Sequence, residues 1–221
     1  MRRINKSEEP QSLRKFNKAK HENWTEISDP ANRHVYNDCL QQCFEDQARL
    51  CGYTEVPLPK DKDKDKEKNK DEDEVKRHID HYIKKDFAPD LTFCWNNMIA
   101  AVKDDNFGAD YKDKHVKRTD YDKSGCCYTD ILNPVRDEFE NRFRFSADGT
   151  IEPSDNKDIK AKKTIELFNL NEERLKEHRK VQMESVRGYI NGGLAKEEIL
   201  AILAKDGFVS AIEYELSQAN D

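Results

Sequence analysis

Residues Arg77–Ile83 read RHIDHYI, and this stretch decides both the fold and the chemistry expected of the chain. We predict that it forms a strand. Side chains alternate along a strand, so His78 and Asp80 would share one face and His81 the other, although the twist at a hairpin end can bring Asp80 and His81 to one edge. A carboxylate beside an imidazole suits a one-metal nuclease, in which the carboxylate holds a divalent cation and the imidazole takes a proton from the attacking water. Surface polar contacts are the alternative for such side chains.

The pattern on either side of this strand is mostly helical, so the expected fold class is α+β, with helices around a small strand pair. Residues 35–50 repeat apolar side chains at a spacing of four, which predicts an amphipathic helix. Residues 50–54 predict a short strand or turn, and residues 93–102 predict a loop that enters a helix. From Thr164 onward, apolar residues at helical spacing punctuate a charged sequence, which glycine interrupts at residues 191–193.

The run Lys60–Lys76 consists almost entirely of alternating lysine and acidic residues, KDKDKDKEKNKDEDEVK. Such a segment cannot bury apolar area, so we expect a solvated, flexible insertion over residues 59–76, with a partner-binding segment as the alternative. The insertion lies inside the first of two expected units. That unit, residues 1–155, begins with a helical segment and contains the RHIDHYI strand, and residues 156–221 form a helical C-terminal region.

The C-terminal region, residues 156–221, is expected to dock on a partner protein. Its compact apolar residues have two interpretations, an exposed docking surface or plain helix-packing core, and we favour the core. The residues concerned are Ile199, Leu203 and Ile212.

The composition excludes several classes of protein. The 221 residues include 39 basic and 45 acidic side chains, for a net charge of −6, and the mean hydropathy is −1.05. No apolar run approaches the roughly 18 residues of a membrane span, and the start of the sequence lacks the apolar stretch of a signal peptide. We therefore expect a soluble, cytoplasmic protein that does not bind membranes. The negative charge also predicts weak unaided binding to nucleic acid, so part of any basic binding surface would come from a partner.

Short sequence segments, spread over roughly residues 1–180, together match the motifs of a known protein family. The segments are MRRINK at residues 1–6, EDQ at 45–47, LCGYTE at 50–55, RHIDHY at 77–82, FCWNNMI at 93–99, ILNP at 131–134, FRF at 143–145, DGTI at 148–151 and TI at 164–165. Together they resemble the HNH endonuclease family, and within it the branch of PtuB-type nuclease subunits from Septu and retron-linked anti-phage systems. Because the match is spread along the chain, it is more specific than an isolated Asp-His pair.

The resemblance implies a ββα-metal (HNH) core, in which a hairpin is followed by a helix, and it implies roles for three side chains. His81 would be the general base that activates water. Asp80 would be a ligand of Mg²⁺ (or Mn²⁺). Asn97 would brace the loop that aims the histidine and would not itself react.

The last metal ligand is less well fixed by the resemblance. In many members it lies nine residues after the bracing asparagine, which is Asn106 here, and an amide carbonyl oxygen can bind Mg²⁺. Asp110 and His115 are alternatives, because this branch varies in the spacing between loop and helix. His78 fills a frequent histidine position of the branch, and structural, phosphate-contacting and catalytic roles all stay open for it.

Many relatives also hold the fold together with a zinc ion bound by two C-x-x-C pairs. The corresponding positions here fall at or near Cys51, Thr54, Val102 and Asp105. A single remaining thiolate cannot make a tetrahedral site with four ligands, so no structural zinc is expected. Packing by Tyr53, Phe93 and Trp95 is expected in its place.

The function implied by the resemblance is that of a metal-dependent HNH endonuclease, an effector of anti-phage defence that works with an ATPase subunit of the PtuA type. The substrate would be nucleic acid, with DNA as the first candidate. One alternative is a toxin that cleaves tRNA or other RNA with the same site, and another is a catalytically degenerate HNH scaffold that binds the ATPase. A retron DNA–RNA hybrid is a further candidate partner.

Overall fold

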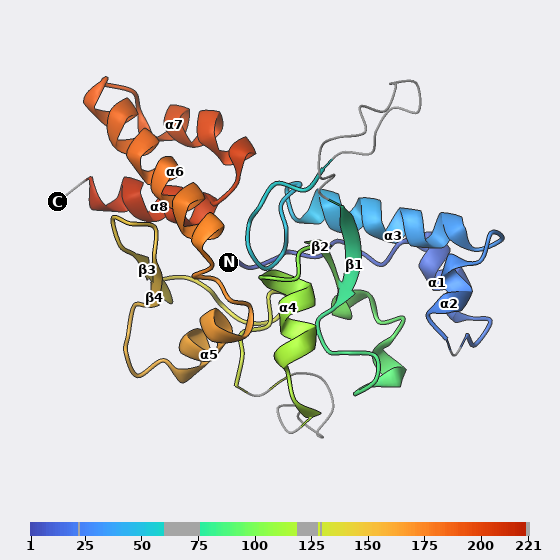
Figure 1. The fold of residues 1–221 in the computed structure, drawn as a ribbon. Helices are drawn as coiled ribbons and strands as arrows, with labels where there is room; N and C mark the ends of the chain where they lie inside the picture. The colour runs from blue at the N-terminus through green and yellow to red at the C-terminus, as the bar shows by residue number, and fades with distance from the viewer. Residues whose placement is uncertain (22, 60–75, 119–127, 129, 220–221) are drawn as a thin grey trace, which may run out of the picture.

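The structure is a computed structural model that describes residues 1–21, 23–59, 76–118, 128 and 130–219 (Figure 1). Of the flexible insertion predicted over residues 59–76, residues 60–75 lie outside the described residues. The fold class is mixed α+β, as predicted, but the described residues form two small two-stranded sheets where a single strand pair was expected. Within the same residues, no helix combines the length and the apolar character needed to cross a bilayer.

The elements follow one another in a simple order. The helices are α1 (Gln11–Asn17), α2 (Thr25–Ser28), α3 (Arg33–Asp46), α4 (Gly108–His115), α5 (Ile159–Leu167), α6 (Glu173–Asn191), α7 (Lys196–Leu203) and α8 (Val209–Gln218). The strands are β1 (Arg77–His81), β2 (Met98–Val102), β3 (Phe143–Phe145) and β4 (Ile151–Pro153). Short 3₁₀ turns occur at Pro89–Leu91, Trp95–Asn97 and Ala204–Asp206.

Strands β1 and β2 form an antiparallel hairpin, in which Asp80 lies opposite Ile99 and His81 opposite Met98. Helix α4 follows β2 in the chain and packs against it, and α3 also packs against the hairpin (Figure 1). The chain therefore has a strand–strand–helix arrangement built around the RHIDHYI segment. This arrangement places the end of β1 beside α4.

Strand β2 corrects one prediction. Residues 98–102 were predicted as part of a loop that enters a helix, but they form a strand, and the helix begins only at Gly108. All five side chains of β2 are buried, because α3 and α4 both pack against the strand. A strand covered on both faces shows no alternation of polar and apolar residues, so the run MIAAV carries no signal that separates it from a buried helical turn.

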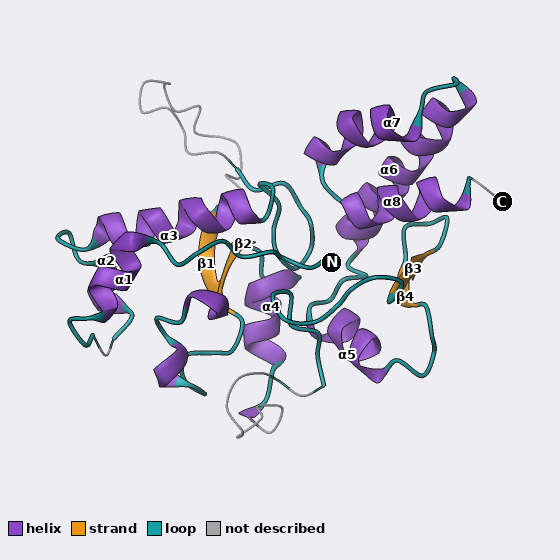
Figure 2. Ribbon diagram, turned by 180° about the vertical axis from the view of Figure 1, so that it is seen from behind, coloured by secondary structure: helices purple, strands orange, loops and turns teal. Residues whose placement is uncertain are grey.

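Helix α3 confirms the helix predicted over residues 35–50 but ends earlier. Its buried face is formed by Val35, Cys39, Leu40, Cys43 and Phe44. Ala48 and Arg49 follow the helix with positive φ angles of 53° and 67°, a backbone conformation that cannot continue it. Residues 50–54 then form a turn, closed by a bridge between residues 50 and 57, and α1 lies along α3 (Figure 2).

Helices α6, α7 and α8 form a compact unit with an apolar cluster of its own (Figure 2). Ile199 and Ile212 are fully buried in this cluster, and Leu203 is 6% exposed. These three residues are therefore helix-packing core, the interpretation favoured from the sequence, and they do not form an exposed docking surface. That residues 156–221 dock on a partner stays a prediction.

Buried polar contacts join the C-terminal helices to the first 155 residues. The carboxylate of Glu55 accepts hydrogen bonds from the backbone N–H (2.8 Å) and the hydroxyl (2.6 Å) of Ser210, at the start of α8. The same carboxylate lies 2.5 Å from the amino nitrogen of Met1, which Figure 1 places between the hairpin and the C-terminal helices. In α6, Arg179 donates to the carbonyl oxygen of Gly149 at 2.6 Å. The two units predicted from the sequence are thus packed on one another.

Gly149 is a position where the packing of α6 requires glycine. Its φ is +83°, and a Cβ there would lie 1.9 Å from the carbonyl oxygen of Lys176. We expect Gly149→Ala to lower the free energy of unfolding by about 2 kcal/mol, because left-handed backbone strain adds to the clash with α6. Gly193→Ala is the matched control, because Gly193 also has a positive φ, of +84°, but a Cβ at this position would have no neighbouring atom within 4 Å.

The control isolates the contact with α6 from the backbone strain. Gly193→Ala should cost only the strain, about 1 kcal/mol. Urea unfolding of both variants measures the two losses. Equal losses of unfolding free energy would show that the close approach of Gly149 to α6 does not contribute to the cost of Gly149→Ala.

Candidate functional site

A cavity of about 240 Å³ lies at the end of β1, where the strand leads into the loop toward β2. It is lined by Trp24, His78, Ile79, Asp80, His81, Lys84, Lys85, Asp86, Asp110 and Asp113. Asp80 and His81 therefore border one cavity although they are adjacent on a strand, as the twist of a hairpin end allows. His78 and Asp110, whose roles were open, line the same cavity.

The imidazole of His81 is fixed in one tautomer. Its Nε2 lies 2.8 Å from the carbonyl oxygen of Thr92. Because a carbonyl oxygen only accepts hydrogen bonds, this contact requires the proton on Nε2 and leaves the lone pair on Nδ1. Trp24 packs edge-on against the ring, with the ring centroids 4.5 Å apart. Burial lowers the pKa of His81 to about 4, so the imidazole is neutral near pH 7 and Nδ1 is its basic atom.

Asn97 holds together the loop that connects β1 to β2. Its Oδ1 accepts a hydrogen bond from the backbone N–H of Ile83 at 2.8 Å. Its Nδ2 donates to the carbonyl oxygens of Ile83 (3.1 Å) and Leu91 (3.2 Å). The loop held in this way also carries Thr92, whose carbonyl fixes His81. These are the contacts that a loop brace needs.

Replacing Asn97 tests this bracing. We expect Asn97→Ala to lower the free energy of unfolding by about 1–3 kcal/mol, because it leaves the buried backbone groups of the loop without their partner. The neighbouring Asn96 is exposed, so Asn96→Ala is a matched control and should change stability by less than about 0.5 kcal/mol. Urea unfolding measures both, and a loss at Asn97 no larger than that at Asn96 would rule out the brace.

The carboxylate of Asp80 is already paired within the protein. Its Oδ2 accepts a hydrogen bond from the hydroxyl of Tyr53 at 2.5 Å and another from the ammonium of Lys112 at 2.7 Å. Asp80 is 5% exposed and Lys112 is fully buried. Burial lowers the pKa of Lys112, but the charges of Asp80 and Asp113 raise it by more, so the net pKa is raised and the side chain stays an ammonium.

Sequence reasoning missed Lys112 and gave Tyr53 a packing role alone. Tyr53 does pack, stacked on Phe168 with centroids 4.5 Å apart, but its hydroxyl also reaches Asp80. Burial, and then the charge of Asp80, raise the pKa of Tyr53 well above its ordinary value, so the phenol keeps its proton and donates. The signal for Tyr53 was its place in the LCGYTE segment. Lys112 has no such signal, because it stands in the sequence YKDKH among other charged residues.

The contacts of Asp80 do not fit a divalent ion. Mg²⁺ takes oxygen ligands at about 2.0–2.1 Å in near-octahedral geometry, whereas Oδ2 of Asp80 already has two donors, and one of them is a cation. Across the described residues, no group of three or more His, Cys, Asp or Glu side chains is arranged to hold a metal ion. The Mg²⁺ (or Mn²⁺) implied by the resemblance stays a prediction that these contacts do not support.

The structure separates the three candidates for the last ligand. Asn106 is exposed, and its side-chain amide and backbone N–H both bond to Oδ1 of Asp104, so it lies outside the cavity that Asp80 borders. His115 is also exposed and stacks on Tyr111, with centroids 3.9 Å apart. Of the three, Asp110 is the one that lines the cavity.

Asp110 and His78 face one another across the cavity wall. Oδ1 of Asp110 lies 4.0 Å from Nε2 of His78, just outside hydrogen-bond distance. Among the described residues, neither Oδ2 of Asp110 nor Nδ1 of His78 has a hydrogen-bond partner, although both atoms are buried. The pair therefore has unused hydrogen-bonding capacity beside His81.

The four positions that the resemblance matches to zinc ligands lie in different surroundings. Cys51 and Thr54 are buried in the turn after α3, and Val102 is the last residue of β2. Asp105 pairs with Lys114 at 2.9 Å on the surface. The expectation that the chain holds no structural zinc stays a prediction.

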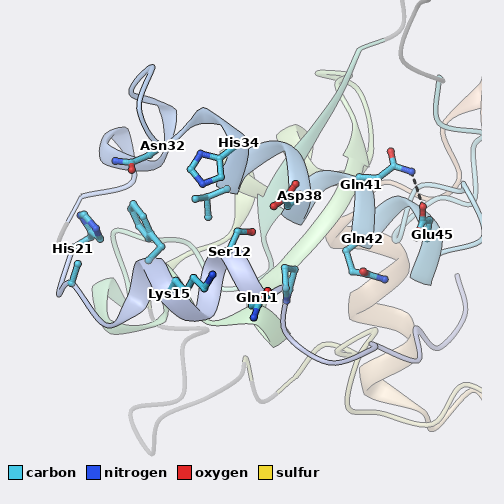
Figure 3. Close-up of a pocket in the computed structure, with 14 residues that line it drawn as sticks. Gln11, Ser12, Lys15, His21, Asn32, His34, Asp38, Gln41, Gln42 and Glu45 are labelled. Carbon is cyan, nitrogen blue, oxygen red and sulfur yellow. Dashed lines mark hydrogen bonds between the residues drawn. The ribbon is translucent and has the colours of Figure 1, made fainter.

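A larger hollow of about 730 Å³ lies between α1 and α3 (Figure 3). Figure 3 shows polar side chains along both walls, with Gln41 donating to Glu45 at 2.8 Å. None of the side chains proposed for catalysis or metal binding from the sequence lines this hollow. The smaller cavity at the end of β1 is therefore the candidate functional site.

Comparison with known proteins adds no relative to this picture: no protein-family model matches the chain, and no curated protein matches it. The HNH resemblance therefore rests on the motif segments of the sequence. A function for the cavity has to be argued from the residues that form it.

Proposed function

We propose that this chain is an HNH-type nuclease that hydrolyses the phosphodiester bonds of nucleic acid. The observation that carries the proposal is the fixed tautomer of His81, whose Nε2–H is held by the carbonyl of Thr92. A neutral imidazole with its lone pair on Nδ1 can take a proton from a water molecule, and its pKa of about 4 makes it a weaker base than a free histidine. Asn97 supports the same assignment, because it braces the loop that provides this carbonyl.

In this proposal, the cavity beside His81 receives the scissile phosphate. Lys84 and Lys85 line the cavity and would supply positive charge for the phosphate oxygens, against the negative charge of Asp86, Asp110 and Asp113 on the same lining. Water attacks phosphorus while Nδ1 of His81 takes its proton. The bond from phosphorus to the leaving oxygen then breaks, the leaving oxygen takes a proton from solvent, and the imidazolium returns its own proton to solvent.

The proposal includes a partner, an ATPase subunit of the PtuA type, and a role as an effector of anti-phage defence. The motif segments that resemble the PtuB-type branch support it. The net charge of −6 also supports it, because a chain of this charge binds a polyanion weakly unless a partner adds basic surface. The substrate is DNA or, with the same site, tRNA or another RNA.

A second candidate function is a scaffold that binds the ATPase without cleaving nucleic acid. The observation that favours it is the ammonium of Lys112 on Asp80, the carboxylate that the resemblance gives to a metal ion. A site without a metal ion can still keep the fold that the scaffold needs to bind the ATPase.

One experiment distinguishes these functions. The full chain, alone and co-expressed with the ATPase, is incubated with supercoiled DNA, single-stranded DNA and tRNA, each in Mg²⁺, in Mn²⁺ and in EDTA. The nuclease proposal expects cleavage of one polymer, stronger with the ATPase present. Intact polymers under every condition, together with stable binding of the ATPase, would replace the nuclease by the scaffold.

A further inference from the structure

The ammonium of Lys112 lies in a cage of four oxygen atoms. It is 2.7 Å from Oδ2 of Asp80 and 2.7 Å from the carbonyl oxygen of His81. It is 3.2 Å from the carbonyl oxygen of Tyr82 and 3.2 Å from Oδ1 of Asp113. The side chain is fully buried, so these oxygens, and not water, surround the charge.

This cage is the kind of ligand set that proteins offer to a hard cation, because it combines two carboxylates with two main-chain carbonyls. The two distances of 2.7 Å are those of charge-assisted hydrogen bonds from an ammonium, whereas Oδ1 of Asp113 is an ion-pair contact without a hydrogen bond. All four distances are longer than the bonds of about 2.1 Å that Mg²⁺ makes. An ion bound through Oδ2 of Asp80 would have to share that oxygen with Lys112. Two cations on one carboxylate in a buried site repel one another, whichever oxygen the second cation binds, so either the lysine or the ion occupies it.

We infer that Lys112 is the resident cation of the Asp80 site, so that the native chain binds no Mg²⁺ or Mn²⁺ through Asp80. The ammonium neutralises the carboxylate and ties α4 to the end of β1, where a divalent ion would otherwise join the same two elements. Removing the side chain leaves the oxygen cage and a hole of the size of the lysine. Lys112→Ala should therefore create a cation site that the native chain lacks.

The test is equilibrium dialysis of the full chain against Mn²⁺, with free Mn²⁺ read by electron paramagnetic resonance. Wild type and Asp80→Asn should bind the same amount of Mn²⁺. Lys112→Ala should bind one further equivalent, at least tenfold more tightly than any site of the wild type, and Lys112→Ala combined with Asp80→Asn should lose it. The matched control is Lys114→Ala, on the same helix but half-exposed and paired with Asp105, which should leave Mn²⁺ binding unchanged.

Two results would overturn the inference. One is an equivalent of Mn²⁺ on the wild type that disappears in Asp80→Asn, and the other is a folded Lys112→Ala that gains no site. Circular dichroism reports whether the variants fold. If the variants do not fold, the melting temperature of the wild type is measured with and without 10 mM Mg²⁺ at matched ionic strength. A melting temperature raised by several degrees would overturn the inference, and an unchanged melting temperature supports it.

The inference rests on the proposed function and extends it, because Lys112 of the chain, and not a metal ion, supplies the positive charge at Asp80. Its test measures ion binding in the absence of nucleic acid. Failure of the nuclease proposal would appear as intact DNA and RNA. Failure of this inference would appear as Mn²⁺ held through Asp80. The two outcomes are separate measurements on separate samples.

Discussion

His81→Ala is expected to lower the rate of phosphodiester cleavage by about 10²–10⁴-fold, the usual contribution of a general base. The variant removes the imidazole whose tautomer is fixed by the carbonyl of Thr92, while Asn97 and the loop that carries Thr92 keep their contacts. Cleavage is measured under single-turnover conditions with the polymer that the wild type cuts. A rate within threefold of the wild type would exclude His81 as the base.

A surface histidine provides the control for this experiment. His34 lies on α3 and is exposed, so His34→Ala should cleave at the wild-type rate. His81→Gln is a further useful variant, because an amide can keep a hydrogen bond to the carbonyl of Thr92 but cannot take the proton of water. Loss of activity in both His81 variants, with native circular dichroism, places the defect in proton transfer and not in folding.

The low pKa of His81 also predicts how stability depends on pH. The folded value of about 4 lies below the ordinary value of 6.5, because burial disfavours the imidazolium. Below pH 6.5 the unfolded chain therefore binds a proton that the folded chain does not take up until about pH 4, so stability falls as the pH falls through this window. The stability difference between wild type and His81→Gln, from urea unfolding at pH 7.5 and pH 5, isolates this contribution from the carboxylates. A difference that does not change with pH would contradict the neutral imidazole.

Lys112→Met is expected to lower the free energy of unfolding by about 3–5 kcal/mol, the cost of leaving a buried charge without its partner. Methionine fills nearly the same volume, so the loss comes from the charge of Asp80 and from the carbonyl oxygens that the ammonium bonds. Urea unfolding followed by the fluorescence of the two tryptophans, of which Trp24 contacts His81 beside Asp80, measures the loss.

Two further variants separate the buried pair from general effects of changing a lysine. Lys114→Ala, whose side chain is 53% exposed, should cost no more than about 1 kcal/mol. Lys112→Met combined with Asp80→Asn should be more stable than Lys112→Met alone, because the second change removes the stranded charge. Additive losses in the double variant would mean that the two side chains do not form an energetically coupled pair.

The strand predicted over Arg77–Ile83 is confirmed over Arg77–His81, and Tyr82 and Ile83 already belong to the loop. Asp80 and His81 meet at one cavity because a hairpin twists at its end, which the sequence allows but does not require. Strand β2 was not predicted, because a strand that is buried on both faces has no alternation of polar and apolar residues in its sequence. A periodic sequence pattern shows which face of an element is exposed to solvent, and β2 has no exposed face.

The partners of Asp80 could not be predicted, for a different reason. Tyr53 lies 27 positions before Asp80 and Lys112 lies 32 positions after it, so the contacts depend on how the turn after α3 and helix α4 meet the hairpin. A buried lysine is rare, and in a chain with 38% charged residues it is indistinguishable from its exposed neighbours. Asn106 was proposed only from the spacing that the resemblance implies, and spacing does not record which residue of a loop turns outward.

The bonds between Glu55 and Ser210 have a consequence for the order in which the molecule assembles. They connect positions 155 residues apart, whereas β1 and β2 are near neighbours along the chain. Bringing distant segments together costs loop-closure entropy, so contacts of this separation form late in folding. The hairpin and its histidine can therefore take shape before the C-terminal helices dock. A chain shortened before α8 would retain that hairpin but would leave the Glu55 carboxylate without the two hydrogen bonds from Ser210.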